Sequence, residues 1–259
     1  MNILVACKVV YDDQYIGKTR SGGLDFEHAT RDVSTYDLNA IEAASQLAAA
    51  HPGTTVTALS VGAADIDDSK IRKSIIAHGV DSLVMVADDA CADMDSFATA
   101  AELAQLVRDA GEWDLVLCGD GSDDICGRQV GVQLADRLGV PYVSYVCSIE
   151  LDEQARVARC SRLDGRMVER LEVPLPAVLA VDPSIAQPRM CSVMDIMKAG
   201  RKPQSVVAAS DPQRPTVETV AILAPPPSNR RCEVFDAGEA GGIRRFVELV
   251  APVLAGAGK

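Results

Sequence analysis

Short apolar runs alternate with amphipathic stretches over the first 140 residues of the chain. Residues 2–10, 54–62, 81–87 and 114–118 are mostly apolar runs, which are typical of strands covered on both faces. Between them, residues 36–51, 67–79 and 96–111 place apolar side chains at helical spacing. The alternation predicts a doubly wound, mostly parallel, Rossmann-like α/β sheet.

The first predicted helix has a recognisable start signal. Ser34 and Asp37 have the spacing of a capping box in which Asp replaces the usual Glu. Leu38, Ile41 and Leu47 then follow on one helical face. We therefore expect a helix whose first turn is closed by its own side chains.

The rhythm changes after Pro141. Residues 142–152, 155–165, 166–173 and 176–182 resemble strands joined by short turns, one of them at Asp164-Gly165, and they predict antiparallel strands added to the sheet. Beyond Pro188 we expect an irregular segment, then a linker rich in Pro, Ser and Gln, and a short amphipathic helix over 243–254. This part predicts an extended C-terminal arm without a core of its own.

Composition narrows the classes of protein. With 259 residues, 48% of them hydrophobic, the chain can bury a substantial core. The formal charge of −12 disfavours nucleic acids and acidic membrane surfaces as partners. The sequence has no run of roughly 18 apolar residues and no signal-peptide pattern, so we expect a cytoplasmic protein.

The cysteines do not predict a disulfide framework or a metal site. They are scattered, form no C-x-x-C pair, and are accompanied by only three histidines. Several lie inside apolar runs, as buried thiols do. The eight are Cys7, Cys91, Cys118, Cys126, Cys147, Cys160, Cys191 and Cys232.

The stretch 119–131, GDGSDDICGRQVG, follows a predicted strand and leads into a predicted helix. At that position in an open α/β sheet, loop amides can bind an anion such as a phosphate. The alternative is that its glycines and aspartates only form a tight turn and cap the helix. The chain lacks both the Rossmann dinucleotide fingerprint and a Walker P-loop.

Several separated segments, in the right order, resemble the beta subunit of electron transfer flavoprotein, and most closely its FixA-type branch. They are NILVACKVV, YDLNAIEAA, VTALSVG, DLVLCGDGSDDICGRQVG, and LPAVLAVDPSIAQPR with MDIMKAGRKP. Asp164, Gly165, Glu169, Leu171 and Pro176 also fit, whereas Arg166 stands where a small or acidic residue is expected. The resemblance covers nearly the whole chain.

The resemblance implies a heterodimer with an alpha subunit that holds most of an FAD, and an adenine nucleotide bound to this chain. AMP is expected, with a second FAD as the alternative, because the run Cys126-Gly127-Arg128 replaces the Asp-Thr-Ala type run of electron-bifurcating members. Val130 also lies where many members of the family carry a threonine. The implied cofactor-binding residues are Ala6, Ser34, Thr35, Tyr36, Asp37, Val61, Gly119, Asp120, Gly121, Ser122, Asp123, Asp124, Ile125, Cys126, Gly127, Arg128, Gln129 and Val130.

By the same resemblance, residues 1–189 form the nucleotide-binding domain, 190–203 a recognition loop for a partner flavin dehydrogenase, and 204–259 an arm that packs on the alpha subunit. The docking residues are Val193, Met194, Ile196, Met197 and Lys198. Their flexible apolar side chains suit a surface that accepts more than one partner. The implied role is an electron carrier subunit, which FixA-type relatives link to acyl-CoA or carnitine metabolism, with no catalytic residue and no metal of its own.

Two other classes remain open from the residues alone. The first is a Mg²⁺-dependent nucleotide-hydrolysing enzyme with Asp120, Asp123 and Asp124 around the ion. For this class, Asp12 and Asp13 are the only candidates as general base or nucleophile. The second is a nucleotide sensor of the universal stress type, which leaves residues 190–259 without a role. The sequence does not distinguish AMP from FAD, and it identifies neither the dehydrogenase, the direction of electron flow nor the flavin potential.

Overall fold

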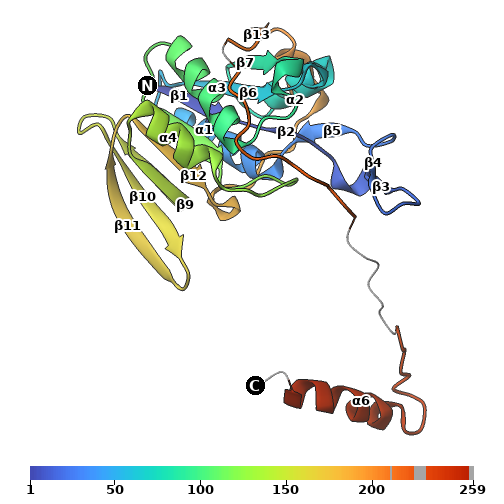
Figure 1. Ribbon diagram of the computed structural model, residues 1–259. Helices are drawn as coiled ribbons and strands as arrows, with labels where there is room; N and C mark the ends of the chain where they lie inside the picture. Colours follow the sequence, from blue (N-terminus) through green and yellow to red (C-terminus); the bar gives the residue numbers. More distant parts are fainter. Residues whose placement is uncertain (211, 225–231, 257–259) are drawn as a thin grey trace. The chain divides into compact units, whose positions relative to one another are not determined.

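The computed structural model describes residues 1–210, 212–224 and 232–256 (Figure 1). The chain divides into two compact units, Met1–Ile222 and Leu223–Lys259, and each is treated by itself. The APPPSNR stretch of the linker expected before the last helix lies, except for Ala224, outside the described residues. Every buried apolar residue within the described ranges lies between Ile3 and Ala199, so the core belongs to the first unit.

A nine-stranded mixed sheet forms the centre of the first unit, with the order β11-β10-β9-β12-β8-β1-β6-β7-β13. Seven neighbouring strands are parallel, which confirms the predicted α/β fold. They are β1 (Asn2–Ala6), β6 (Thr55–Gly62), β7 (Ser82–Ala87), β8 (Leu115–Gly119), β9 (Tyr142–Asp152), β12 (Ala177–Val181) and β13 (Gln204–Val207).

Helices cover both faces of the sheet. On one face, α1 (Thr35–Ala50) and α2 (Ser69–Ala77) share a core with Ile3 and Val5 of β1. On the other, α3 (Ser96–Asp109) and α4 (Val130–Leu138) share a second core with Leu4 and Ala6. Because successive side chains of a strand point to opposite faces, one apolar run supplies both cores. This explains why the central strands read as continuous apolar segments.

The antiparallel strands expected after Pro141 are also present. Strand β10 (Val157–Asp164) pairs antiparallel with β9 and with β11 (Met167–Pro174), and Gly165 has a positive φ of 59° in the turn between β10 and β11. Cross-strand ion pairs join Arg159 to Glu172 and Arg162 to Glu169. These strands extend one edge of the parallel sheet.

The prediction of one strand over residues 2–10 is wrong. The sheet strand β1 ends at Ala6, and the chain resumes as β2 (Val9–Tyr11), which pairs with β5 (Arg31–Val33) in a separate two-stranded sheet. Between them, the Cys7 amide donates to Leu59 O while the Lys8 amide donates to a side chain, Asp37 Oδ2. The chain therefore leaves the sheet at Lys8. A second small hairpin, β3 (Gly17–Lys18) with β4 (Leu24–Asp25), was not predicted either.

The segment after Pro188 is more regular than expected. Helix α5 (Val193–Ala199) begins with a capping box in which Ser192 and Asp195 exchange hydrogen bonds. Strand β13 then joins the main sheet beside β7. Apolar residues such as Val193, Ile196 and Met197 recur here at helical spacing, and the cap of α5 and the pairing of β13 with β7 add to the order of the segment.

The second unit contains helix α6 (Gly242–Gly256), which confirms the predicted C-terminal helix. Ile243, Phe246, Val247, Val253 and Leu254 are exposed on it, and the Phe235 ring lies 5.8 Å from that of Phe246. Across the described residues, no helix combines the length and the apolar character that crossing a bilayer requires. This unit has an apolar surface and few buried groups.

Candidate functional site

The glycine-rich loop lies where the strand order of the sheet reverses. From β1 the chain proceeds to β6 and β7 on one side, then returns to β8 on the other side of β1. The loop 119–129 follows β8 directly and ends at α4 (Figure 1). The crevice beyond the carboxyl ends of strands at such a switch point is the usual ligand site of an open α/β sheet.

Asp37 joins two segments at this switch point. Its Oδ2 accepts from the Lys8 amide at 2.8 Å and its Oδ1 from the Gly119 amide at 2.9 Å. Burial raises the pKa of Asp37 to about 7, although the two backbone hydrogen bonds and the charge of Lys8 act in the opposite direction. Asp37 therefore holds the loop after β1 against the end of β8.

The predicted capping box at Ser34 and Asp37 is wrong. The Ser34 side chain makes no cap hydrogen bond to its own helix, and Asp37 faces Lys8 and Gly119 instead. Asp123 of the glycine-rich loop binds the helix start: its carboxylate accepts from Thr35 N at 2.6 Å and from Thr35 Oγ1 at 2.7 Å. The cap of α1 is thus supplied by a loop 88 residues further along the chain.

Asp124 pairs with a residue that the sequence did not single out. Its Oδ2 lies 2.5 Å from Lys8 Nζ, and its Oδ1 accepts from Ser122 Oγ at 2.6 Å and from Ile125 N at 2.7 Å. Burial alone would raise the pKa of Asp124, but the hydrogen bonds from Lys8 and Ser122 and the charge of Lys8 lower it. No simple sequence pattern connects Lys8 with a residue 116 positions away.

Asp120 is buried and interacts with Arg128 and Tyr145. Its Oδ1 accepts from the Tyr145 amide at 3.4 Å, and its Oδ2 lies 3.4 Å from Arg128 Nε. Burial raises the pKa of Asp120, while the Tyr145 hydrogen bond and the Arg128 charge oppose that rise. Arg128 also bonds the Tyr145 hydroxyl and lies over its ring. Tyr145 is a second residue that sequence reasoning missed.

The backbone adopts uncommon conformations in the loop and at Tyr145 of β9, which contacts the loop. Cys126, Arg128 and Tyr145 have φ values of 50°, 55° and 56°, in the left-handed region that non-glycine residues seldom occupy. A Cβ at Gly119 would lie only 2.6 Å from Tyr36 Cβ, so the close approach of β8 to α1 requires glycine there. Such local strain is concentrated at functional sites.

Two described α-helices lack a bond from the side chain of their own N-cap residue: α1, which Asp123 of the loop caps instead, and α4. Asp68, Asp95 and Ser192 bond the first turns of α2, α3 and α5 through their side chains, but Gln129 makes no such bond to α4. The exposed amides of Gly127, Arg128 and Gln129 find no protein acceptor within the described residues. These N–H groups can bind an external anion.

A cavity of about 460 Å³ borders the start of α4. Gln129 and Gln133 line one part of it and Asp95, Thr216 and Val217 another. Of the predicted cofactor-binding residues, Gln129 is the one that this cavity touches. The cavity therefore adjoins the predicted loop and extends toward the chain that follows β13.

The structure brings most of the predicted cofactor-binding residues together. Direct contacts join Ser34, Thr35, Tyr36 and Asp37 to the loop, including a 4.0 Å contact between Cys126 Sγ and the Tyr36 hydroxyl. Ala6 ends β1, and Val61 lies near the end of the adjacent strand β6. The two strand positions thus share the edge at which the loop begins.

The three loop aspartates do not converge on one point. Asp120 faces Arg128 and Tyr145, Asp123 faces Thr35, and Asp124 faces Lys8. Within the described part of the chain, no group of three His, Cys, Asp or Glu side chains is arranged to hold a metal ion. The geometry gives no support to a Mg²⁺ site at this loop.

The predicted docking residues lie on α5 and are exposed. Val193 is 76% exposed and Met197 67%, which is unusual for apolar side chains on a short helix. Met194, Ile196 and Lys198 are exposed as well. These side chains are therefore accessible to another molecule.

Fold and site together define a doubly wound α/β protein with a polar, glycine-rich loop at its switch point. Residues 24–212, well over half of the chain, match the electron transfer flavoprotein domain. The chain belongs to the electron transfer flavoprotein family. Membership implies association with a flavin and a partner subunit, in keeping with an electron carrier.

Proposed function

We propose that this chain is the beta subunit of a heterodimeric electron transfer flavoprotein, close to the FixA-type branch. It binds AMP at the glycine-rich loop, while an alpha subunit holds most of the FAD that carries the electrons. The chain itself supplies no bond-making chemistry; it binds and orients cofactors. Electrons pass between a flavin dehydrogenase of acyl-CoA or carnitine metabolism and a redox partner.

The uncapped start of α4 carries this proposal. The amides of Gly127, Arg128 and Gln129 have no protein acceptor in the described structure, and they lie at the switch point of a chain that belongs to this family. A phosphate there would accept their hydrogen bonds and interact favourably with the helix dipole. Asp123 and Asp124 do not oppose it directly, because Thr35 and Lys8 respectively bind their carboxylates.

The remaining residues of the site have supporting roles in the proposal. Asp37 and Asp123 hold the loop on α1, so that the free amides keep a fixed orientation. Arg128 offers its guanidinium beside the loop, and Ala6 and Val61 bound the crevice at the ends of β1 and β6. In this proposal the nucleotide is AMP and not a second FAD, because the run from Cys126 to Arg128 departs from the electron-bifurcating pattern that the resemblance implies.

The domain organisation is also proposed. Residues 1–189 form the nucleotide-binding domain, 190–203 the docking segment for the dehydrogenase, and 204–259 the arm that packs on the alpha subunit. Strand β13 belongs to the main sheet, so the arm leaves the domain only after Val207. Its exposed apolar residues, such as Val220 and Phe246, are suited to covering by another chain.

The test is to purify the heterodimer and to release its bound nucleotides. Mass spectrometry then identifies the nucleotides and gives their number per heterodimer. One FAD and one AMP per heterodimer support the proposal, whereas two FAD support the bifurcating alternative. A complex without flavin overturns the electron-carrier role. Metal-dependent ATP hydrolysis by the purified chain would instead favour the nucleotide-hydrolysing enzyme.

A pair of matched variants tests the position of the phosphate. Gln129→Glu places a carboxylate at the cap of α4, where it competes with an anion while keeping the acceptor for Ser96 Oγ. Gln133→Glu makes the same change one turn further into the helix. We expect Q129E to lose most of its bound nucleotide without losing helix stability, and Q133E to retain it. Equal retention by both variants would place the phosphate elsewhere.

A further inference from the structure

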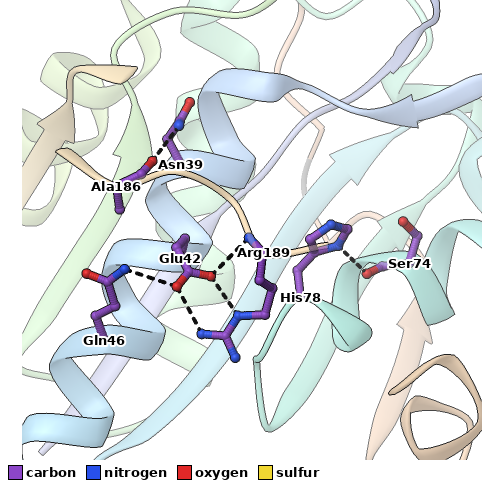
Figure 2. A network of polar contacts seen from close by, with 7 residues as sticks. All are labelled: Asn39, Glu42, Gln46, Ser74, His78, Ala186 and Arg189. Carbon is purple, nitrogen blue, oxygen red and sulfur yellow. Dashed lines mark hydrogen bonds and ion pairs between the residues drawn. The ribbon is translucent and has the colours of Figure 1, made fainter. Parts of the chain in front are cut away.

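The segment before the docking helix α5 is fastened to α1 by side chains that lie outside the glycine-rich loop. Asn39 Nδ2 donates to the carbonyls of Pro183 and Ala186, at 3.2 and 2.7 Å. Figure 2 shows Asn39 and Glu42 on one helix, close to the irregular segment that carries Ala186 and Arg189. This segment therefore follows α1 up to the point where it departs for α5.

Arg189 marks that point and is held by Glu42. Glu42 Oε2 accepts from Arg189 Nε at 2.6 Å and from the Arg189 amide at 3.3 Å, and Oε1 accepts from Arg189 Nη2 at 3.2 Å and from Gln46 Nε2 at 3.0 Å (Figure 2). Glu42 is 7% exposed. A bidentate, charge-assisted contact of this kind fixes the orientation of the arginine side chain as well as its distance from the carboxylate.

The neighbouring loop leaves room for the guanidinium. Gly79 has a φ of 115°, and a Cβ there would lie 3.0 Å from Arg189 Nη1 and 2.3 Å from Ser45 Oγ. Burial opposes ionisation of Glu42, yet the hydrogen bonds from Arg189 and Gln46 and the charge of Arg189 keep its pKa below the ordinary value. The pair is thus ionised, with the Glu42 carboxylate buried and the Arg189 side chain 43% exposed.

The docking segment is anchored at both of its ends. Met190, the residue after Arg189, is 97% exposed, and Val193 and Met197 of α5 follow it. At the far end, Ala199 is buried and Lys202 Nζ donates to Val80 O at 2.6 Å. The residues between Arg189 and Ala199 are thus attached at both ends, while α5 also packs against α2 and Cys191 packs against the core beneath α1 and α2.

We propose that Arg189, held by Glu42, is a positioning residue that sets the orientation of the docking segment for the partner dehydrogenase. The inference rests on the proposed role of residues 190–203. Without the ion pair, the segment would have to be ordered at the moment of docking, and this costs conformational entropy. The partner would bind more weakly, while electron transfer within the complex once formed would proceed at a similar rate.

The test uses the purified heterodimer with Glu42→Gln, which removes the charge at nearly constant shape. The control is Glu172→Gln, the same change in the exposed Arg159 pair on the β10–β11 hairpin. We expect E42Q to raise the KM for a flavin dehydrogenase about tenfold. We expect kcat within about twofold of the wild type, unchanged flavin content, and E172Q close to the wild type in every respect.

Hydrogen exchange of residues 190–199 gives a readout that is independent of activity. Faster exchange there in E42Q than in E172Q supports positioning, and equal exchange overturns it. An unchanged KM of E42Q also overturns the positioning role. A loss of flavin with a parallel fall of kcat overturns it as well, because that result would indicate a general structural role. Arg189→Lys keeps the charge but removes the planar guanidinium, so it should give an intermediate KM. This variant replaces E42Q in the test if E42Q does not fold.

The failure of the proposed function would be distinguishable. If the wild-type heterodimer contains no flavin, the electron-carrier role fails whatever the variants do. The exchange comparison between E42Q and E172Q then still decides whether the ion pair orders residues 190–199.

Discussion

At the scale of single residues, four carboxylates of the site are used in different ways. Asp37 and Asp120 are buried, and burial raises the pKa of each. Asp124 faces Lys8, and its pKa is lowered. Asp123 caps the first turn of α1. A loop with three aspartates can thus present free amides to an anion, because each carboxylate already has a partner within the protein.

Replacing Asp37 by asparagine should remove a pH-dependent part of the stability. The pKa of Asp37 is raised from 3.8 to about 7, so the folded chain binds more protons than the unfolded chain between about pH 4 and 7. The free energy of unfolding therefore falls as the pH rises through that window. Asparagine does not titrate, and its single oxygen leaves the Lys8 or Gly119 amide without an acceptor, at a cost of about 1–3 kcal/mol.

Chemical unfolding of both proteins at about pH 5 and pH 8 measures this difference. Between the two pH values, the wild type should lose up to about 3 kcal/mol more stability than D37N. Other titrating groups are common to both proteins and cancel. Parallel pH profiles would show that Asp37 keeps an ordinary pKa.

Gly119→Ala should destabilise the protein by about 2 kcal/mol, because the added Cβ would meet Tyr36 Cβ at 2.6 Å and Asp37 Oδ1 at 2.8 Å. Gly127→Ala is the matched control within the same loop. Its Cβ would meet Ile125 Cγ2 at 4.0 Å, so its effect should stay within about 0.5 kcal/mol. Denaturant unfolding measures both, and similar losses would contradict the described packing of the loop on α1.

At the scale of elements, the chain after β13 is attached along η3 (Asp89–Cys91) and α3 through acidic side chains. Asp88 accepts from the Ala209 amide, Glu102 from the Ser210 amide and hydroxyl, and Asp95 from Thr216 and Val217. These bonds replace the sheet pairing that ends at Val207. They determine where the proposed arm leaves the domain.

Asp95→Asn should release residues 216–217 while leaving α3 intact. Asn is as good an N-cap as Asp and can keep the bond to Ala98 N, but its amide cannot accept from Thr216 N, Thr216 Oγ1 and Val217 N. Asp68→Asn is the control, since among the described residues Asp68 Oδ1 accepts a hydrogen bond from Lys70 N alone, at the start of α2. Faster hydrogen exchange of residues 216–217 in D95N, and not in D68N, is the expected result.

Acid should release the same segment only at very low pH. Burial would raise the pKa of Asp95, yet the bonds from Ala98, Thr216 and Val217 lower it to about 2. A depressed carboxyl pKa contributes stability that is lost as the pH falls through the folded value. The loss begins as the pH falls below the ordinary value of 3.8, so exchange at residues 216–217 that accelerates already near about pH 6 would contradict this attachment.

At the scale of the whole molecule, the two units differ in what stabilises them. The first, Met1–Ile222, contains both hydrophobic cores and the complete sheet. The second, Leu223–Lys259, has α6 with exposed Ile243 and Phe246 and no buried apolar core within its described residues. Folding of the first unit should not depend on the second.

Ending the chain at Ile222 should therefore leave the first unit folded. Circular dichroism and thermal unfolding should match the full chain within a few degrees, because every described core residue is retained. If the arm packs on the alpha subunit, the shortened chain should fail to form the heterodimer in size-exclusion chromatography. A shortened chain that is unfolded, or that still forms a stable heterodimer, would contradict this division.

The sequence by itself determined the class of fold and the position of the loop. The apolar run of β1 and the helical spacing of α1 follow from burial on two faces and on one face, which are local patterns. The loop after β8 could be identified because glycines and aspartates follow a strand and precede a helix. The periodicity of α1, however, gave no indication that its cap would come from Asp123.

The hydrogen-bond and ion-pair partners of the polar side chains follow from the tertiary structure alone. Asp37 binds Lys8 and Gly119, Asp124 binds Lys8, and Glu42 binds Arg189, across separations of 29 to 147 residues. Hydrogen bonds between distant residues leave no periodic trace in a sequence, whereas burial of apolar surface does. The fold could therefore be predicted from the hydrophobic pattern, whereas the hydrogen bonds and ion pairs of the site could not.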